Sequence, residues 1–341
     1  MAEQTIQNVV VCGAGVFGMN HLRVYWTLQQ SGFPVRLTAI VETDALRAAE
    51  LQQEWGVPVY GSIEECLLDC RHDKLRIDAA SVCVPTVGHY QVASALLSAG
   101  IDVLVEKPIA ASLEEAEQLI NLAERHQRVL QVGHLERFNP AVMAVRDLLN
   151  GPMFFEAHRL SVFSPRSLDV DVVLDLMIHD LDIVLAVAQS SVSQVHAVGL
   201  PILSPKVDIA NVRVEFESGC VANFTASRVS TERVRKLRFF QPHEYVSIDY
   251  ARQDLLVINV AARTAGAPSM EAITAGLGIR KPQIAPGEPL RLEIESFLDC
   301  VRGRSQPVVS GKDGSAALEL ALQINTAIAE HSRRAGLDRY V

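Results

Sequence analysis

The sequence lacks the long apolar run that a membrane-spanning helix needs. No stretch approaches about 18 uninterrupted apolar residues, so we expect no transmembrane segment. The N-terminus enters an apolar strand without a basic segment followed by an apolar one, so we expect no signal peptide. Basic charge is also scarce. The 31 lysines and arginines face 40 acidic residues, and this balance argues against a nucleic-acid-binding surface.

Cysteine is sparse and forms no metal-binding pattern. Of the six cysteines, Cys66 and Cys70 share a predicted helix face, but no second Cys/His pair completes a zinc site. Cys12 and Cys83 lie in apolar strands, as small hydrophobic residues do. We therefore predict no metal ion and a reducing, cytoplasmic location.

What the chain does contain is a regular alternation of strands and helices over its first 135 residues. Apolar strands are expected at Asn8–Cys12, Val35–Val41, Pro58–Tyr60, Ala79–Val84, Asp102–Val105 and Arg128–Val132. Such alternation is typical of a parallel sheet covered on both faces. After about residue 136 the pattern changes: a helix is predicted at Pro140–Leu149, and residues 192 to 261 read as a series of β-strands. Residues 262–288, rich in Ala, Gly and Pro, are expected to form a mobile loop.

A glycine-rich loop follows the first strand and opens the first helix. It consists of Gly13, Ala14, Gly15, Val16, Phe17 and Gly18. In this spacing Gly13 permits a tight turn, Gly15 lets the backbone approach a pyrophosphate, and Gly18 lets the helix pack closely on the strand. The helix N-terminus adds N–H groups and a positive dipole end. The loop therefore predicts a dinucleotide site.

Glu42, at the end of the second strand, bears on the choice of dinucleotide. A carboxylate there can accept hydrogen bonds from ribose hydroxyls and would repel a 2′-phosphate, which favours NAD over NADP, although Arg47 lies nearby. We predict an α/β fold class, with an N-terminal Rossmann domain at residues 1–136. A C-terminal α+β domain with a large, mostly antiparallel open sheet is predicted at residues 137–341.

Lys107 comes directly after the strand that starts at Asp102. The carboxyl ends of parallel strands face the ligand crevice, so we expect the Lys107 ammonium to point into the site. There it could stabilise an alkoxide as a hydride leaves carbon. Pro108 would fix the chain direction. The alternative is a solvated lysine at a strand end.

The segment Val170–Leu185 is apolar but carries five ionisable residues. As one α-helix it would align Asp171, Asp175, His179 and Asp182 in a single polar stripe, with Asp180 outside it. A helix this apolar should be mostly buried, and a His one turn from an Asp is a plausible general base with its orienting partner. The alternative is a core histidine satisfied by a structural aspartate.

Five motifs together resemble the Gfo/Idh/MocA family of sugar and cyclitol oxidoreductases. They are GAGVFG at 13–18, VPTVGH at 84–89, VEKP at 105–108, GHLERFNP at 133–140 and LDLMIHDLD at 174–182. The resemblance implies a Rossmann domain followed by an α/β domain whose large sheet often forms a dimer or tetramer interface. We therefore expect a homodimer or homotetramer, because an exposed apolar sheet face needs cover.

The resemblance also implies roles for single residues. Lys107 matches the family's EKP lysine, and Asp175 and His179 match its D-x-x-x-H signature, with His179 as acid/base. Glu106 corresponds to the family's nicotinamide-side acid. The segment that touches the dinucleotide corresponds to Pro85, Thr86 and His89.

Three segments resemble a subgroup that acts on nucleotide-linked amino sugars: GHLERFNPA at 133–141, VLDLMIHDLDIVL at 173–185 and PLRLEIESFLDCVRG at 289–303. This resemblance implies NAD-dependent oxidation at C3 of a UDP-linked N-acetylamino sugar. Arg137 and Arg166 could then meet a diphosphate bidentately, or could form structural salt bridges. The sugar or acetamide could be met by His134, Phe138 and Asn139. Alternatives are a dehydrogenase or reductase of another polyol, such as inositol or a free sugar, and a non-catalytic dinucleotide-binding sensor.

Overall fold

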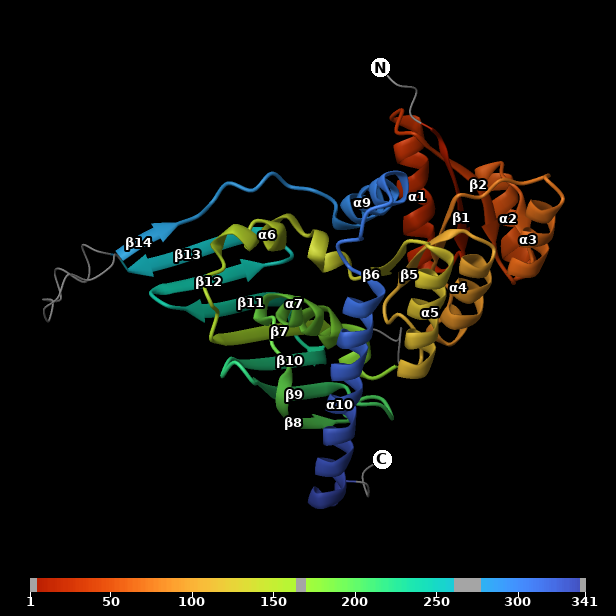
Figure 1. Ribbon diagram of the computed structural model, residues 1–341. Coiled ribbons are helices and arrows are strands. Elements are labelled where there is room, and N and C mark those ends of the chain that lie inside the picture. Colours follow the sequence, from red (N-terminus) through yellow and green to blue (C-terminus); the bar gives the residue numbers. More distant parts are fainter. Residues whose placement is uncertain (1–4, 164–169, 261–276, 338–341) are drawn as a thin grey trace, which may run out of the picture. The chain divides into compact units, whose positions relative to one another are not determined.

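The computed structural model describes residues 5–163, 170–260 and 277–337 (Figure 1). The chain divides into two compact units. The first unit comprises residues 1–135 and 288–315, and the second comprises residues 136–287 and 316–341. The segment 288–315 thus belongs with the first unit, although it follows the second unit's sheet in sequence.

The first unit contains a six-stranded parallel sheet with the order β3-β2-β1-β4-β5-β6. Its strands are β1 (Gln7–Cys12), β2 (Val35–Val41), β3 (Val59–Tyr60), β4 (Ala79–Val82), β5 (Asp102–Glu106) and β6 (Leu130–Gly133). Every residue of β4, β5 and β6 is buried, so both faces of the sheet are covered. The predicted Rossmann-type arrangement is confirmed.

Three helices of the first unit begin directly after a side chain that caps them. The helices of this unit are α1 (Val16–Gln30), α2 (Ala45–Trp55), α3 (Ile63–Arg71), α4 (His89–Ser98), α5 (Leu113–His126) and α9 (Pro289–Gly303). Asp44, Ser62 and Ser112 each accept a backbone N–H of the first turn that follows them, as N-caps do. Helices α1 and α9 share one core with β1 and β2, so the returning segment completes this layer.

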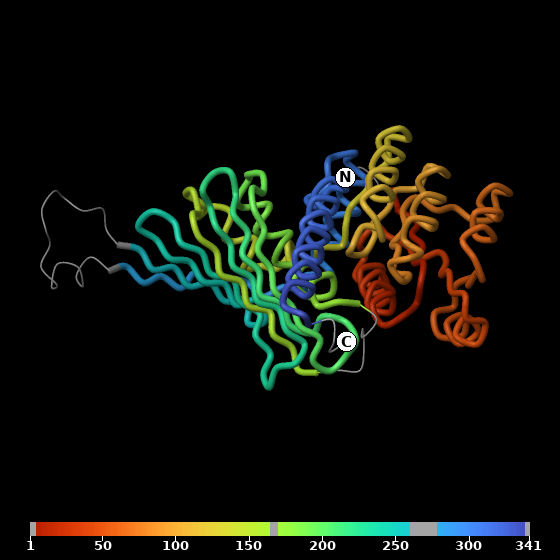
Figure 2. Tube along the Cα trace, turned by 90° about the horizontal axis from the view of Figure 1, so that it is seen from below, coloured from red at the N-terminus to blue at the C-terminus, as the bar shows by residue number. Residues whose placement is uncertain are grey.

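The second unit is built on an eight-stranded sheet with the order β14-β13-β12-β11-β7-β10-β9-β8. The strands are β7 (Phe154–Val162), β8 (Val192–Leu200), β9 (Ile209–Phe216), β10 (Val221–Ser230), β11 (Val234–Gln241), β12 (Glu244–Asp249), β13 (Asp254–Val260) and β14 (Leu277–Arg280). Only the β7–β10 pair is parallel among these described strands, so the mostly antiparallel sheet is confirmed. In Figure 2 its strands lie side by side as one layer.

Helices cover one face of this sheet. The core is formed by alternate residues of the strands together with α6 (Pro140–Met143), α7 (Ile178–Ala188) and residues 316–328 of α10 (Gly311–Ala335). The other face is half-exposed, because residues such as Phe154, Glu156 and His158 alternate with the buried Phe155 and Ala157. No helix in the described ranges is long and apolar enough to cross a membrane.

Two helix predictions in this unit are wrong. The helix expected at Pro140–Leu149 ends at Met143, and a 3-10 turn follows at Arg146–Leu148. The single α-helix expected at Val170–Leu185 is instead a π-helical turn, η4 (Val173–Met177), followed by α7. The expected loop at 262–288 lies outside the described residues up to residue 276, and residues 277–280 form β14.

Candidate functional site

The first unit aligns its chemistry-bearing residues at one edge of the parallel sheet. In register, Cys12 pairs with Val41 and Val82, and Glu106 pairs with Gly133. The glycine-rich loop, Glu42, the segment after β4, Lys107 and His134 therefore all follow the carboxyl ends of these strands. This is the edge where open α/β sheets bind ligands.

The glycine loop has the space that a pyrophosphate requires. A Cβ on Gly18 would lie 1.9 Å from the Gly13 carbonyl oxygen, and Gly13 has a φ of +88°. A Cβ on Gly15 would meet nothing within 4 Å, and Gly15, Val16 and Phe17 are exposed. The N-cap of α1, Gly15, offers no side chain to the first N–H groups of the helix. These features fit an NAD pyrophosphate at the helix N-terminus.

Glu42 links the second strand to this loop. One carboxylate oxygen accepts the Ala14 N–H at 3.0 Å, and the other accepts the Asp44 N–H at 3.0 Å. Arg47, which left the choice of coenzyme open, pairs with Glu50. The half-buried Glu42 carboxylate thus places negative charge beside the loop, which fits NAD.

The segment after β4 shows two different environments. Pro85 is exposed and Thr86 is half-exposed, as residues that touch a dinucleotide should be. His89 is 1% exposed, and its ring nitrogens face the carbonyl oxygens of Pro108 (Nδ1, 2.8 Å) and Val84 (Nε2, 3.0 Å). Because the ring is buried and its nitrogens face backbone carbonyls, the structure gives His89 a core environment, and its contact with the dinucleotide stays a prediction.

Lys107 leaves β5 at the same edge, and the Lys107–Pro108 peptide bond is cis. The preceding Glu106 carboxylate lies 2.9 Å from Nε2 of His21, a fully buried residue of α1. Sequence reasoning missed His21. Its signal was a histidine on the buried stripe of α1, where Leu22 and Tyr25 also lie.

In the second unit, the π-helical turn breaks up the polar stripe that the sequence predicted. Asp171 lies before this turn, and its carboxylate accepts the N–H groups of Val173 and Leu174 and the side-chain amide of Asn325. Asp175 lies in η4 and His179 lies near the start of α7, and both residues are half-exposed. Single π turns are common at functional sites, and here the turn contains Asp175.

Two buried ion pairs hold α7 directly after His179 in sequence. Arg159 of β7 binds the Asp180 carboxylate with two nitrogens, at 2.7 and 3.0 Å, and Glu136 at 3.1 Å. Arg137 binds the Asp182 carboxylate with two nitrogens, at 2.6 and 2.8 Å. Burial lowers the pKa of Arg159, but Asp180 and Glu136 outweigh burial and raise that pKa.

Besides His179, the other five predicted substrate residues lie in contrasting places. Arg137 is 9% exposed and held by Asp182, Phe138 is 3% exposed, and the Asn139 amide binds Glu136 and the Tyr250 carbonyl. The structure thus favours the structural alternative for Arg137 and gives Phe138 and Asn139 core environments rather than open ones. His134 is buried at the end of β6. Arg166 lies outside the described residues.

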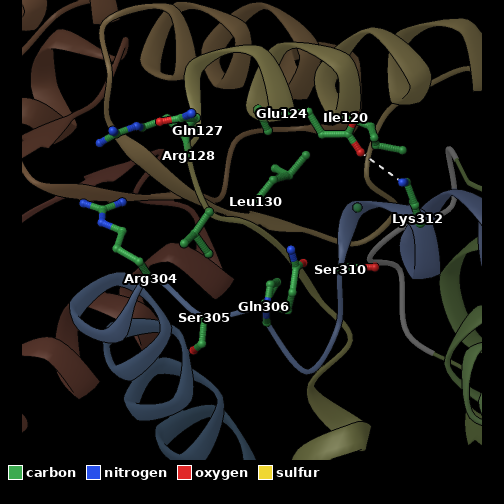
Figure 3. Close-up of a pocket in the computed structure, with 14 residues that line it drawn as sticks. Ile120, Glu124, Gln127, Arg128, Leu130, Arg304, Ser305, Gln306, Ser310 and Lys312 are labelled. Atoms are coloured by element: carbon green, nitrogen blue, oxygen red, sulfur yellow. Dashed lines mark ion pairs between the residues drawn. The ribbon is translucent and has the colours of Figure 1, made fainter.

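A cavity of about 570 Å³ opens in the first unit, lined by residues of α5, the start of β6 and the segment 304–312 (Figure 3). The glycine loop follows the opposite, carboxyl ends of the strands. Its cations have protein partners: Arg304 holds Asp102, and Lys312 holds Glu124. Within the described ranges, no group of three His, Cys, Asp or Glu side chains could hold a metal ion.

Comparisons with known proteins cover both units. Residues 7–134 match the family described as "Oxidoreductase family, NAD-binding Rossmann fold", and residues 154–241 match the "GFO/IDH/MocA C-terminal domain". A UDP-N-acetylglucosamine 3-dehydrogenase of Acidithiobacillus ferrooxidans is 34% identical over 93% of this chain and 96% of that relative. An inositol 2-dehydrogenase of Rhizobium meliloti is 25% identical over 93% of this chain and 96% of its own length.

Solved structures of similar proteins have the same fold. A structure of the Acidithiobacillus ferrooxidans enzyme superposes with a TM-score of 0.84 at 32% identity, and covers 95% of this chain and 98% of that one. A levoglucosan dehydrogenase in complex with NADH superposes with a TM-score of 0.82 at 18% identity, over 96% of this chain and 98% of its own, and shows the shared fold. The chain belongs to the Gfo/Idh/MocA family of NAD-binding oxidoreductases.

Proposed function

We propose that this protein oxidises C3 of a UDP-linked N-acetylamino sugar to a ketone, with NAD⁺ as hydride acceptor. The observation that carries the proposal is the 34% identity with a UDP-N-acetylglucosamine 3-dehydrogenase over 93% of the chain. The shared sequence therefore extends through both units. The 25% identity with an inositol 2-dehydrogenase is the basis of the second candidate, a polyol dehydrogenase.

In the proposed mechanism, bound NAD⁺ supplies a nicotinamide ring that accepts the hydride from the sugar carbon. His179 takes the proton of the hydroxyl that is oxidised, and Asp175 orients the imidazole. The Lys107 ammonium stabilises the negative charge that develops on that oxygen. General base catalysis of this kind contributes roughly 10²–10⁴-fold, and positioning contributes much of the rest.

Coenzyme contacts are proposed for Gly13, Gly15, Val16, Phe17, Gly18, Glu42, Pro85, Thr86 and Glu106. For the substrate we retain His134 and Arg166. Because Arg137, Phe138 and Asn139 are buried among partners of the second unit, we propose that they support the site rather than contact the sugar.

The uncovered face of the eight-stranded sheet supports a proposed homo-oligomer. Phe154 stacks on Phe240 with ring centroids 5.5 Å apart, and Phe240 contacts Tyr245 at 5.1 Å. Phe240 is 37% exposed and Ile279 is 67% exposed on this face. A second copy of the chain would remove this apolar surface from water. All six cysteines are free, which supports the proposed cytoplasmic location.

A substrate panel tests the proposed function. The protein is incubated with NAD⁺ and, separately, UDP-N-acetylglucosamine, UDP-glucose, free N-acetylglucosamine and myo-inositol, and NADH absorbance is followed. We expect turnover with the UDP-linked N-acetyl sugar, and His179→Ala should lower kcat far more than it raises KM. Turnover with inositol alone would favour the polyol candidate. NAD⁺ binding without any reduction would indicate a sensor.

A further inference from the structure

The turn that carries Lys107 is buried except at the lysine itself. From Ile101 to Ala110 every residue except the partly exposed Lys107 is buried. A side chain that must meet a reacting oxygen gains precision when the backbone on both sides of it is fixed. The two residues next to Lys107 in sequence are Glu106 and Pro108. Groups that bind these two residues fix the backbone on both sides of the lysine.

On the Glu106 side, His21 is the anchor. Its Nε2 lies 2.9 Å from the Glu106 carboxylate, its Nδ1 lies 3.1 Å from the Ser81 hydroxyl, and Ser81 lies 2.8 Å from the Tyr25 hydroxyl. His21 and Tyr25 are both fully buried. A Cβ on Gly133 would lie 2.7 Å from the same Glu106 oxygen, so β6 closes the far side of the carboxylate.

One assignment of protons satisfies this whole chain of groups. Tyr25 donates to Ser81, Ser81 donates to Nδ1 of His21, and Nε2–H of His21 donates to the Glu106 carboxylate. Ser81 and His21 then each accept one hydrogen bond and donate one, while Tyr25 donates and the Glu106 carboxylate accepts. The neutral His21 tautomer with its proton on Nε2 is the form that this order requires.

On the Pro108 side, His89 is the anchor. Its Nδ1 faces the Pro108 carbonyl at 2.8 Å, and its Nε2 faces the Val84 carbonyl at 3.0 Å. In the neutral ring the single proton satisfies the shorter contact, to Pro108. His89 begins α4, and His21 belongs to α1, so two different helices hold the two sides of the turn.

We propose that His21 and His89 are positioning residues that hold the Lys107 turn from opposite sides, through the Glu106 carboxylate and the Pro108 carbonyl. The inference rests on the role proposed above for Lys107. Neither histidine touches the sugar. Each acts by fixing the backbone that carries the lysine, so its loss should lower kcat more than it weakens NAD binding.

The two histidines present opposite ring nitrogens to the turn, which allows a crossed test. The amide nitrogen of Gln reaches the place of a histidine Nε2, and that of Asn reaches the place of Nδ1. His21→Gln should therefore keep the donor to Glu106, whereas His21→Asn keeps only the Ser81 contact. At His89 the order reverses, because Asn keeps the Pro108 contact and Gln keeps the Val84 contact.

We expect His21→Asn and His89→Gln to lower kcat by about 10–100-fold, the scale of a small misplacement of a catalytic group. Their partners, His21→Gln and His89→Asn, should stay within about fivefold of the parent. Melting temperature and the Kd for NADH are measured on all four variants. A fold-wide effect would follow melting temperature and would not reverse between the two positions. The same amide favoured at both positions would overturn the proposal, and either pair decides alone if the other does not fold.

A second readout separates this proposal from the proposed function. The chain has six lysines, so reductive methylation with ¹³C-formaldehyde gives few NMR signals, and Lys107→Arg assigns the one of interest. The Lys107 signal should be unchanged in His21→Gln and His89→Asn and displaced or broadened in the other two variants. If the parent reduces no NAD⁺ with any sugar, the proposed function fails, and this signal still decides the inference. An identical signal in all four variants would overturn it.

Discussion

Replacing Arg137 with methionine should destabilise the second unit strongly. The Asp182 carboxylate is 1% exposed and receives two hydrogen bonds from the Arg137 guanidinium. Removing the arginine leaves a buried charge without its cation, which costs about 3–5 kcal/mol in the free energy of unfolding. For a unit of this size, 1 kcal/mol shifts the melting temperature by about 2–4 °C, so we expect a loss of about 6–20 °C.

The double variant Arg137→Met/Asp182→Leu is the matched control. With both charges removed and the volume kept apolar, stability should return to within about 1–2 kcal/mol of the parent. Differential scanning calorimetry measures both variants, and the KM for UDP-N-acetylglucosamine is measured alongside. If Arg137 instead binds the substrate diphosphate, Arg137→Met will raise KM strongly while stability stays within about 1 kcal/mol. That result would refute the structural role argued here.

Three further predictions concern the first unit. Gly15→Ala should fold normally but weaken NAD binding, because its Cβ enters the open space at the α1 N-terminus, whereas Gly18→Ala should lose stability, since its Cβ would lie 1.9 Å from the Gly13 carbonyl oxygen. Calorimetry measures the stability of both variants, and NADH titration measures their binding. Equal effects of the two substitutions would count against the pyrophosphate site. Glu42→Gln should narrow the preference for NAD over NADP, measured as the ratio of their kcat/KM values, and an unchanged ratio would remove Glu42 from coenzyme choice. Burial lowers the pKa of His89 below its ordinary 6.5, opposed by its two carbonyl partners, so the folded state binds fewer protons there than the unfolded state; stability should therefore fall as pH drops below about 6.5, and less so in His89→Asn, as urea midpoints at several pH values would show.

Local signals predicted much of the fold. Strand and helix order in the first unit followed from apolar runs and the glycine loop, because these are short-range properties of the chain. The strands after residue 192 likewise followed from their β pattern, and β9 and β10 form an antiparallel pair. The return of residues 288–315 to the first unit could not be foreseen, because it depends on long-range packing of α9 against α1.

The candidate site was predicted less completely. A pattern read at the α-helical period cannot reveal the π turn at Val173–Met177, so Asp171 and Asp182 were placed in one stripe with His179. Their partners, Asn325 and Arg137, are distant in sequence, and nothing local selects them. Buried polar groups find partners through the fold, and only the fold identifies those partners.

The most direct test of the central claim uses UDP-N-acetylglucosamine carrying deuterium at C3. The parent protein with NAD⁺ should transfer that deuterium to the nicotinamide and leave a 3-keto sugar, as mass spectrometry of both products would show, and His179→Ala should form almost none. Reduced coenzyme without deuterium would place the oxidised carbon elsewhere. If neither this substrate nor any other compound of the panel reduces NAD⁺, the proposed oxidation is contradicted.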